Sequence, residues 1–201
     1  MTTAPRPSLD DRVALLRAFL RSPLRVGTVV PSSRFLERRI VELGAVGDAT
    51  LIVELGPGTG STTRAILGAM PRHARLLCIE IDPQLHGLLR RIEDRRLIAH
   101  LGSAEQLREI LALHRLPAPD VVISGIPFST MERTVARRIL DTIQAVLPHG
   151  GHFVAYQIRN RVTQLCSPGL ELTRVELELL NVPPHRVFQW EKNGARAGDT
   201  G

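Results

Sequence analysis

Cysteine, aromatic residues and long apolar runs are scarce in this sequence, and each scarcity excludes a class of protein. The 201 residues include two cysteines, Cys78 and Cys166, which lack the CxxC or histidine spacing typical of a zinc site. We therefore expect two reduced thiols and no metal. Aromatic residues make up 3% of the chain, too few to build a full aromatic cage around a ligand cation. Apolar runs stay well below the roughly 18 residues of a membrane span, and no signal-peptide core is visible, so we expect a cytoplasmic protein.

Lysine is also nearly absent. Lys192 is the only lysine among 26 basic residues, and the excess over 20 acidic residues gives a net charge of +6. Positive charge of this kind favours polyanionic partners, either nucleic acid or an anionic bilayer. With 43% hydrophobic and 23% charged residues, the chain has the composition of one compact globular fold with a real core.

Strand-like apolar runs alternate with helical patterns along the chain. The runs lie at 51–55, 76–81, 97–101, 121–124 and 153–158, and the helical patterns at 61–70, 83–93, 104–114 and 131–147. Such alternation predicts an α/β fold with a parallel sheet and helices on both faces. Two later β-rich segments, 171–180 and 186–190, predict an antiparallel hairpin at the sheet edge. We divide the chain into amphipathic N-terminal helices (1–47), the α/β domain (48–192) and a disordered tail (193–201).

A glycine-rich turn follows the first predicted strand. In LIVELGPGTG (51–60), Gly56, Gly58 and Gly60 alternate after an apolar run that contains Glu54. Ligands of such sheets lie at the carboxyl ends of the strands, where glycines let the backbone approach them closely. The spacing does not match the dinucleotide fingerprint, and no lysine stands where a phosphate-binding loop needs one. The turn therefore favours another ligand over NAD or a nucleoside triphosphate.

A second acid, Glu80, ends the second predicted strand twenty residues after Gly60. A carboxylate at this place can accept hydrogen bonds from both hydroxyls of a ribose. One ribose without a pyrophosphate describes S-adenosylmethionine, with S-adenosylhomocysteine as the product. Glu54 is costly to bury without a partner, and the cationic methionyl part of this cofactor would provide one. We assign cofactor binding to Glu54, Gly56, Gly58, Thr59, Gly60, Glu80, Ile81, Ser103, Ala104 and Ser124.

Three more segments end strands at the same edge of the sheet. HLGSAEQL follows the third strand and would bring Ser103 and Ala104 to the adenine ring, while HFVAYQI ends the fifth with Tyr156, the only tyrosine. VVISGIPF ends the fourth strand at the expected point of methyl transfer. Ser124 and Tyr156 are the candidate catalytic residues, because either hydroxyl could orient a substrate amine. Tyr156 could equally be an ordinary core aromatic residue.

The same turn supplies two candidate substrate contacts, Pro127 and Phe128. Phe128 and Tyr156 could hold a methylated ammonium by cation–π contact. The alternative for Pro127 and Phe128 is a simple turn with a buried aromatic residue. Their place at the carboxyl end of a strand argues for the functional interpretation.

Several motifs together resemble one family. RSPLRVGTVVPSSRFL, VELGPGTGSTTRAIL, IEID, SGIPF and NVPPHRVFQW are similar to motifs of the small soluble bacterial phospholipid N-methyltransferases, whose sequences are similar to rRNA adenine dimethylases. The resemblance extends from about residue 15 to residue 190, and SPLRVGTVVPSS is its most specific part. It implies a class I methyltransferase with a Rossmann-like sheet that methylates phosphatidylethanolamine stepwise towards phosphatidylcholine, with ornithine lipids among related substrates. By this resemblance the cofactor is held by Glu54, Gly56, Gly58 and Glu80.

Two departures from the dimethylase pattern bear on the substrate. The dimethylases usually carry an acid where this chain has Ser103. They also place an asparagine before the aliphatic–Pro–aromatic motif, and its amide oxygen meets an adenine amine. Here Ser124 and Gly125 precede that motif, so the planar amide acceptor is missing. The pattern thus disfavours nucleic acid, although rRNA adenine N6-methylation remains the main alternative.

The N-terminal segment SLDDRVALLRAFLRSPLR predicts an amphipathic helix. Its apolar residues recur at helical spacing, and Arg17, Arg21 and Arg25 lie along the remainder. Such a helix can lie in the interface of an anionic bilayer, or it can pack on its own domain. Ser32 and Ser33 could cap the next helix or contact a lipid phosphate. We expect a peripheral enzyme on the inner face of the plasma membrane; a third possibility is a non-catalytic S-adenosylmethionine-binding protein at that surface.

Overall fold

The computed structural model describes residues 33–158, 160–166, 168–181 and 183–193. The predicted amphipathic helix, with Arg17, Arg21 and Arg25, lies outside the described residues. So do Ser32 and the tail from residue 194 onwards. The membrane-binding helix therefore stays a prediction.

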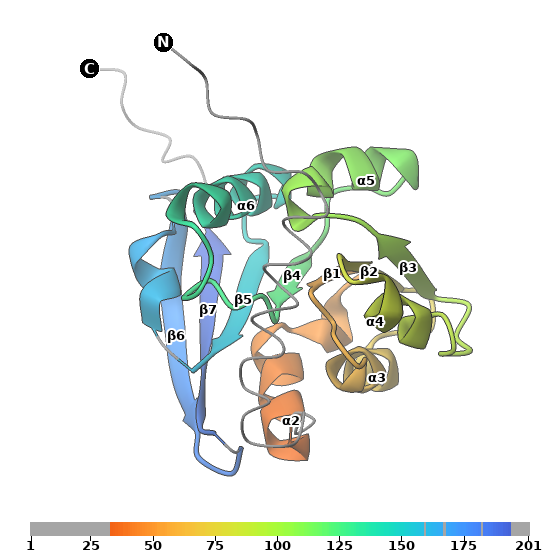
Figure 1. Cartoon of the computed structure of the whole chain (residues 1–201), viewed down its shortest axis with the longest axis horizontal. Coiled ribbons are helices and arrows are strands. Elements are labelled where there is room, and N and C mark those ends of the chain that lie inside the picture. Colours follow the sequence, from red (N-terminus) through yellow and green to blue (C-terminus); the bar gives the residue numbers. More distant parts are fainter. Residues whose placement is uncertain (1–32, 159, 167, 182, 194–201) are drawn as a thin grey trace. The chain divides into compact units, whose positions relative to one another are not determined.

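A seven-stranded sheet forms the centre of the described unit, with the strand order β3-β2-β1-β4-β5-β7-β6 (Figure 1). The strands are β1 (Leu51–Leu55), β2 (Arg75–Glu80), β3 (Leu97–Leu101), β4 (Val121–Ser124), β5 (His152–Gln157), β6 (Leu170–Glu178) and β7 (His185–Lys192). The first five are parallel to one another, whereas β7 runs antiparallel to both β5 and β6. Both the parallel sheet and the antiparallel edge hairpin are confirmed.

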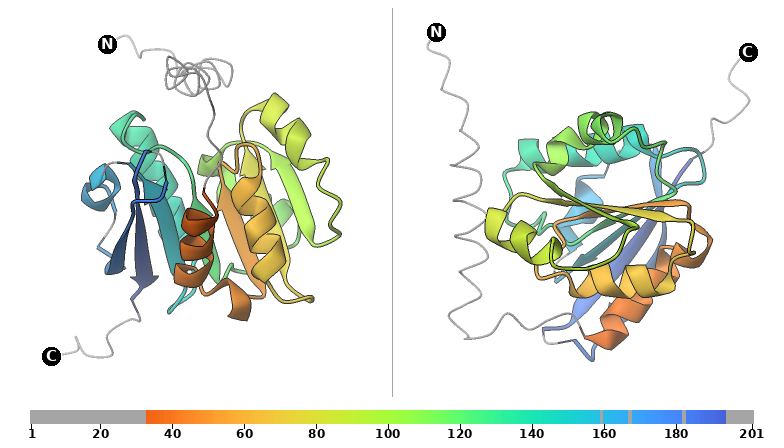
Figure 2. Two further views of the ribbon diagram at one scale, coloured as in Figure 1. Left: turned by 90° about the horizontal axis from the view of Figure 1, so that it is seen from below. Right: turned by 90° about the vertical axis from the view of Figure 1, so that its right-hand side faces the viewer.

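Helices cover both faces of the sheet, as the alternating sequence pattern predicted. They are α2 (Arg34–Leu43), α3 (Ser61–Ala69), α4 (Pro83–Leu89), α5 (Leu107–Leu113) and α6 (Arg133–Val146), with 3₁₀ turns η2 (Val46–Asp48), η3 (Ala104–Gln106) and η4 (Asn160–Gln164). Figure 2 shows α5 and α6 on one side of the sheet and α2 and α3 on the other. Successive residues of a strand face opposite sides, so Val53 packs with α5 and α6 while Ile52 packs with α2 and α3.

Helix α2 belongs to the core of the sheet unit. Leu36, Ile40 and Leu43 are buried in the same cluster as Ile52 of β1. Ser33 caps the helix, because its hydroxyl accepts a hydrogen bond from the backbone N–H of Leu36 at 3.2 Å. The segment that we grouped with the N-terminal helices thus shares its buried face with the α/β domain from residue 34 onwards.

The β6–β7 hairpin turns at the carboxyl edge of the parallel strands. Because β7 is antiparallel to both neighbours, β6 runs parallel to β5, and Glu178 at its end pairs with His185. The described residues of the tip, 179–181 and 183–184, therefore lie at the edge where the glycine turn lies. Arg39 of α2 fixes this arrangement through ion pairs with Glu176 and Glu178 on β6.

Candidate functional site

The turn after β1 has a backbone that favours glycine at each of its three glycine positions. Gly56, Gly58 and Gly60 have φ angles of 68°, 60° and 82°, in the left-handed region that side chains disfavour. A Cβ atom on Gly56 would also lie 3.1 Å from the Ile126 side chain. Gly60 is the N-cap residue of α3. A Cβ atom on Gly58 would meet nothing within 4 Å, so the turn is open at this position, at the carboxyl end of the central strand.

Glu80 connects the end of β2 to this turn. Its carboxylate oxygens accept hydrogen bonds from the backbone N–H of Gly58 at 3.1 Å and of Asp82 at 2.9 Å. Burial raises the pKa of Glu80, and these backbone donors partly offset that effect. The two acids and the glycines that we assigned to one site are therefore brought together, with Thr59 and Ile81 as chain neighbours of Gly58 and Glu80.

Glu54 is fully buried at the end of β1 and keeps one oxygen without a partner. Its Oε2 accepts hydrogen bonds from the Thr63 hydroxyl at 2.6 Å and from the Cys78 thiol at 3.2 Å. Within the described part of the chain, Oε1 has no hydrogen-bond partner. Burial raises the pKa of Glu54 to about 7. A buried acid with an open oxygen is the arrangement that a ligand cation would complete.

Thr63 and Cys78 are site residues that the sequence analysis did not assign. Cys78 pairs directly with Glu54 in the parallel register of β1 and β2. Burial raises the pKa of the Cys78 thiol well above its ordinary value, so the thiol stays protonated and donates to the carboxylate. Thr63 lies in the first turn of α3. The register of the two strands is the signal that could have identified Cys78.

The segment assigned to the adenine ring lies beside Glu80. The backbone N–H of Gly102 donates to the carbonyl oxygen of Glu80 at 2.9 Å. The Ser103 hydroxyl caps η3 by accepting a hydrogen bond from the N–H of Glu105 at 3.3 Å. Ala104 is buried against α5 and α6. Ser103 thus supports the turn itself, and contact of Ser103 and Ala104 with adenine remains a prediction.

The turn after β4 is held by hydrogen bonds on both sides. The Ser124 hydroxyl accepts a hydrogen bond from the N–H of Ile126 at 3.2 Å, and the side-chain amide of Gln157 donates to the Ile126 carbonyl at 2.6 Å. Phe128 is fully buried in the core cluster that faces α6, as in the buried-aromatic alternative for this turn, and Pro127 is half-buried. A role for Phe128 in holding an ammonium stays a prediction. The side chain of Ile126, in the same turn, packs against the core cluster that contains Phe128.

Tyr156 extends from β5 across the end of β4. A Cβ atom at Gly125 would lie 2.3 Å from the phenol oxygen, so the absence of a side chain there makes room for the ring. Thr62 is a hydrogen-bond partner of the phenol, and burial raises its pKa above the ordinary value. Tyr156 therefore keeps its proton at neutral pH. It lies close enough to Glu54 that the carboxylate contributes to this shift.

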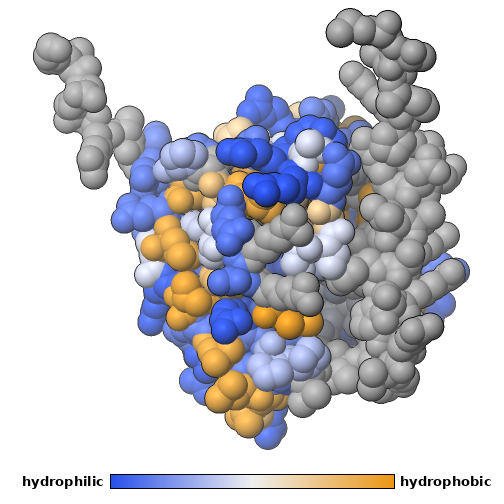
Figure 3. Space-filling model, turned by 60° about the vertical axis from the view of Figure 1, so that its left-hand side comes forward, coloured by the Kyte–Doolittle hydropathy of each residue, from blue (hydrophilic) through white to orange (hydrophobic). Residues whose placement is uncertain are grey.

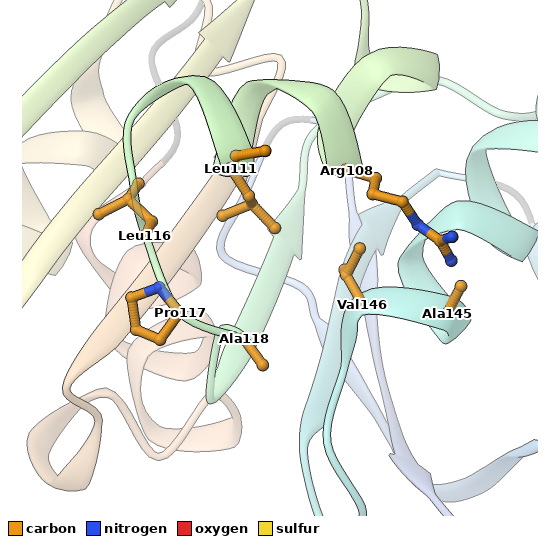
Figure 4. A pocket seen from close by; sticks show the side chains of 8 residues that line it. Arg108, Leu111, Leu116, Pro117, Ala118, Ala145 and Val146 are labelled. Carbon is orange, nitrogen blue, oxygen red and sulfur yellow. The ribbon is translucent and has the colours of Figure 1, made fainter.

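A shallow apolar pocket of about 300 Å³ lies away from this site, between α5 and α6 (Figure 4). Leu116 and Pro117, which line it, precede β4, so the pocket is at the amino edge of the sheet. In the described ranges, no cluster of three or more His, Cys, Asp or Glu side chains is arranged to hold a metal ion. None of the described helices is long and apolar enough to cross a membrane.

Comparison with known proteins finds similarity to methyltransferases. No family model matches the chain. The ornithine lipid N-methyltransferase of Singulisphaera acidiphila is 28% identical over 159 residues, which cover 78% of this chain and 80% of that protein. The ribosomal RNA small subunit methyltransferase A of Cutibacterium acnes is 28% identical over 171 residues, covering 81% of this chain and 50% of that protein. The chain thus spans about half the length of this second relative.

Solved structures share the fold at low sequence identity. The N-methyltransferase NodS of Bradyrhizobium japonicum, in complex with S-adenosylhomocysteine, matches 90% of this chain and 97% of its own with a TM-score of 0.69 at 15% identity. TrmN of Thermus thermophilus matches 88% of this chain and 52% of its own with a TM-score of 0.68 at 19% identity. The chain has the class I methyltransferase fold.

The comparisons support a methyltransferase that uses S-adenosylmethionine. Structural neighbours hold S-adenosylhomocysteine or S-adenosylmethionine. The residues present fit this cofactor, because the glycine turn is open at Gly58, Glu80 is fixed at the turn, and the unpartnered Glu54 oxygen suits a cation. Those three elements would hold the cofactor, which supplies an activated methyl group.

Proposed function

We propose that this protein transfers methyl groups from S-adenosylmethionine to the amine of a membrane-lipid head group, as in the conversion of phosphatidylethanolamine towards phosphatidylcholine. The observation that carries the proposal is the turn after β4. It presents Ser124, Gly125 and Ile126 where the resembling dimethylases place an asparagine whose amide oxygen meets an adenine amine. The relative named ornithine lipid N-methyltransferase, which aligns over most of both chains, supports a lipid amine as the substrate.

The side chains around this turn suit a neutral amine. An attacking nitrogen must offer its lone pair, and desolvation favours the neutral form because it lowers the pKa of an ammonium group. At this turn Phe128 is fully buried and Tyr156 is partly buried, so an amine bound beside them would be partly desolvated. Tyr156 keeps its proton at neutral pH, so we assign it to hydrogen bonding and positioning rather than to proton abstraction.

An RNA adenine N6-methyltransferase is the second candidate. It is favoured by the net charge of +6 and by the similarity to ribosomal RNA methyltransferases. Against it stand the missing amide acceptor and the coverage of only half of the Cutibacterium acnes relative. A non-catalytic cofactor-binding protein at the membrane surface is a third candidate.

The membrane location follows from the substrate. A lipid amine lies in the head-group layer, so the enzyme has to work at a bilayer surface. The arginine-rich sequence from residue 8 to residue 25 is suited to an anionic surface, because each basic residue near it contributes roughly 1 kcal/mol. A cytoplasmic, peripheral location on the inner face of the plasma membrane is part of this proposal.

A labelling assay tests the function. The protein is incubated with methyl-labelled cofactor and vesicles of phosphatidylethanolamine or ornithine lipid, and the extracted lipids are separated by chromatography. We expect labelled mono-, di- or trimethylated lipid. Absence of label from every amine lipid, with cofactor binding intact, would refute the proposal in favour of a binding protein or another substrate.

A further inference from the structure

The tip of the β6–β7 hairpin exposes large apolar side chains at the carboxyl edge of the sheet. Leu179 and Leu180 retain 66% and 63% of their full exposure. Residues 179–184 read LLNVPP and contain no charged side chain. Glu178, which precedes them, is buried and ion-paired with Arg39. Two adjacent leucines held in water at a turn are unfavourable unless a partner covers them.

Contacts with α2 fix the position of the tip. The Asn181 side chain accepts a hydrogen bond from the backbone N–H of Ser33 at 2.8 Å and donates one to the Pro183 carbonyl at 3.0 Å. The first turn of α2 therefore lies beside the tip. This turn of α2 adds the half-exposed ring of Phe35 to the apolar surface of the tip. The Arg34 guanidinium lies 5.2 Å from the centroid of this ring.

The apolar surface continues from the tip along β6. Leu172, Val175 and Leu177 of this edge strand are each about half exposed. A bulge between Leu172 and Arg174 shifts the alternation, so that all three apolar side chains share one face of the strand. Figure 3 shows a band of apolar side chains running down this side of the described unit to its lower end.

The tip and the candidate site lie at the same edge. The ring of His185, at the base of the hairpin, lies 6.5 Å from that of Tyr156, and burial lowers the pKa of His185, which favours its neutral form. Figure 1 shows the hairpin projecting on this side of the sheet. A partner that covers the tip is therefore brought next to the turn after β4.

We propose that the hairpin tip inserts into the interface of a lipid bilayer and so places the carboxyl edge of the sheet on the membrane. This inference deepens the proposed function, on which it rests. A lipid surface fits better than a protein, because a protein covering this edge would obstruct the approach of a lipid amine to Tyr156. Arg34, in the first turn of α2 beside the tip, adds a cation that suits an anionic surface.

The test compares two edges of the same full-length protein. The double variant Leu179→Glu, Leu180→Glu places charges at the tip. The matched control, Leu113→Glu, changes an equally exposed leucine (69%) at the end of α5, at the opposite edge of the sheet. Flotation is measured with vesicles of phosphatidylethanolamine and phosphatidylglycerol. Binding should fall roughly tenfold or more for the double variant and stay at the wild-type level for the control.

Equal flotation of the double variant and the wild type would overturn the proposal. A wild-type dimer that the tip variant dissociates, with flotation intact, would overturn it as well and assign the tip to a second copy. Thermal unfolding and cofactor titration of each variant show that the folded unit is intact. Flotation needs no methyl transfer, so it tests membrane binding by the tip even if the labelling assay finds no lipid product.

A kinetic comparison gives a second readout. If the tip holds the enzyme on the bilayer, the double variant should lose more rate on vesicles than on a short-chain phosphatidylethanolamine present as monomers. Equal losses on both substrates would mean that the tip acts on the fold rather than on the membrane, and would contradict the proposal.

Discussion

Tyr156 lies directly over Gly125, in a space that a side chain at position 125 would fill. A Cβ atom there would come within 2.3 Å of the phenol oxygen and 2.8 Å of the ring carbon that bears it. This close approach of Tyr156 to Gly125 connects the ends of β5 and β4 at the point where the substrate amine is expected. It gives the glycine of the SGIPF segment a specific role.

Substitution of Gly125 by alanine should therefore displace Tyr156. Overpacking of this kind typically costs about 1–3 kcal/mol of stability, and we expect a larger loss in kcat than in cofactor affinity. Fixed-time methylation assays measure kcat, and cofactor titration measures the affinity. Tyr156→Phe is the matched variant, since it removes the hydroxyl without crowding. Wild-type kcat in Gly125→Ala would show that the position of the phenol does not matter.

Glu54 should make the stability of the cofactor-free protein depend on pH. Its folded pKa of about 7 lies above the ordinary value of 4.5, so the folded state prefers the protonated acid. Stability from this group is thus fully present below about pH 4.5 and is lost as pH rises to 7. Each pKa unit corresponds to about 1.4 kcal/mol, so the difference between 4.5 and about 7 gives a loss of at most roughly 3.5 kcal/mol.

Glu54→Gln isolates this effect, because the neutral amide can still accept a hydrogen bond from Thr63. Relative to the wild type, the variant should gain stability in urea unfolding at pH 8 and gain little at pH 5. An identical difference at both pH values would show that Glu54 has an ordinary pKa.

Cofactor affinity should show the opposite trend with pH. If the ionised Glu54 carboxylate meets a cation of the cofactor, binding favours the charged form and strengthens as pH rises from 5.5 to 7.5. The dissociation constant should fall by up to about tenfold per pH unit below the pKa. Isothermal titration of the wild type and of Glu54→Gln measures this, and the variant should bind weakly with a flat profile. If the cofactor affinity of Glu54→Gln still depended on pH, Glu54 would be excluded as the titrating group.

Glu80→Ala should weaken cofactor binding and also destabilise the turn. The substitution removes the acceptor of two backbone donors, those of Gly58 and Asp82. Each donor left buried without a partner costs about 1–3 kcal/mol. Glu80→Gln keeps an acceptor for one of these backbone donors. Comparing it with Glu80→Ala therefore separates the support that Glu80 gives to the turn from its contribution to cofactor binding. Unchanged affinity by calorimetry in both variants would place the ribose elsewhere.

The sequence predicted the parallel strands well, and the structure brings the glycine turn and Glu80 together at their carboxyl ends. The five parallel strands are short apolar runs because most of them are buried on both faces, and helices separate them in the chain. Glycines at Gly56, Gly58 and Gly60 predicted the open turn, and the structure confirms a left-handed backbone at each. Such features depend on local sequence, which is why they could be predicted.

Features that depend on strand register could not be predicted in the same way. The contact of Cys78 with Glu54 arises from the pairing of β1 and β2, and the position of Tyr156 over Gly125 from the packing of β5 beside β4. The exposed band on β6 also depends on the bulge after Leu172, which changes the direction of every later side chain. Each requires knowledge of residues far apart in the chain.

A competition assay tests the central claim most directly. The enzyme receives limiting methyl-labelled cofactor in one reaction with phosphatidylethanolamine vesicles and ribosomal RNA, and the phases are then separated by organic extraction. We predict label in the methylated amine of the lipid phase, lost in Glu80→Ala. Label in the RNA, recovered as N6-methylated adenine with none in lipid, would contradict the account.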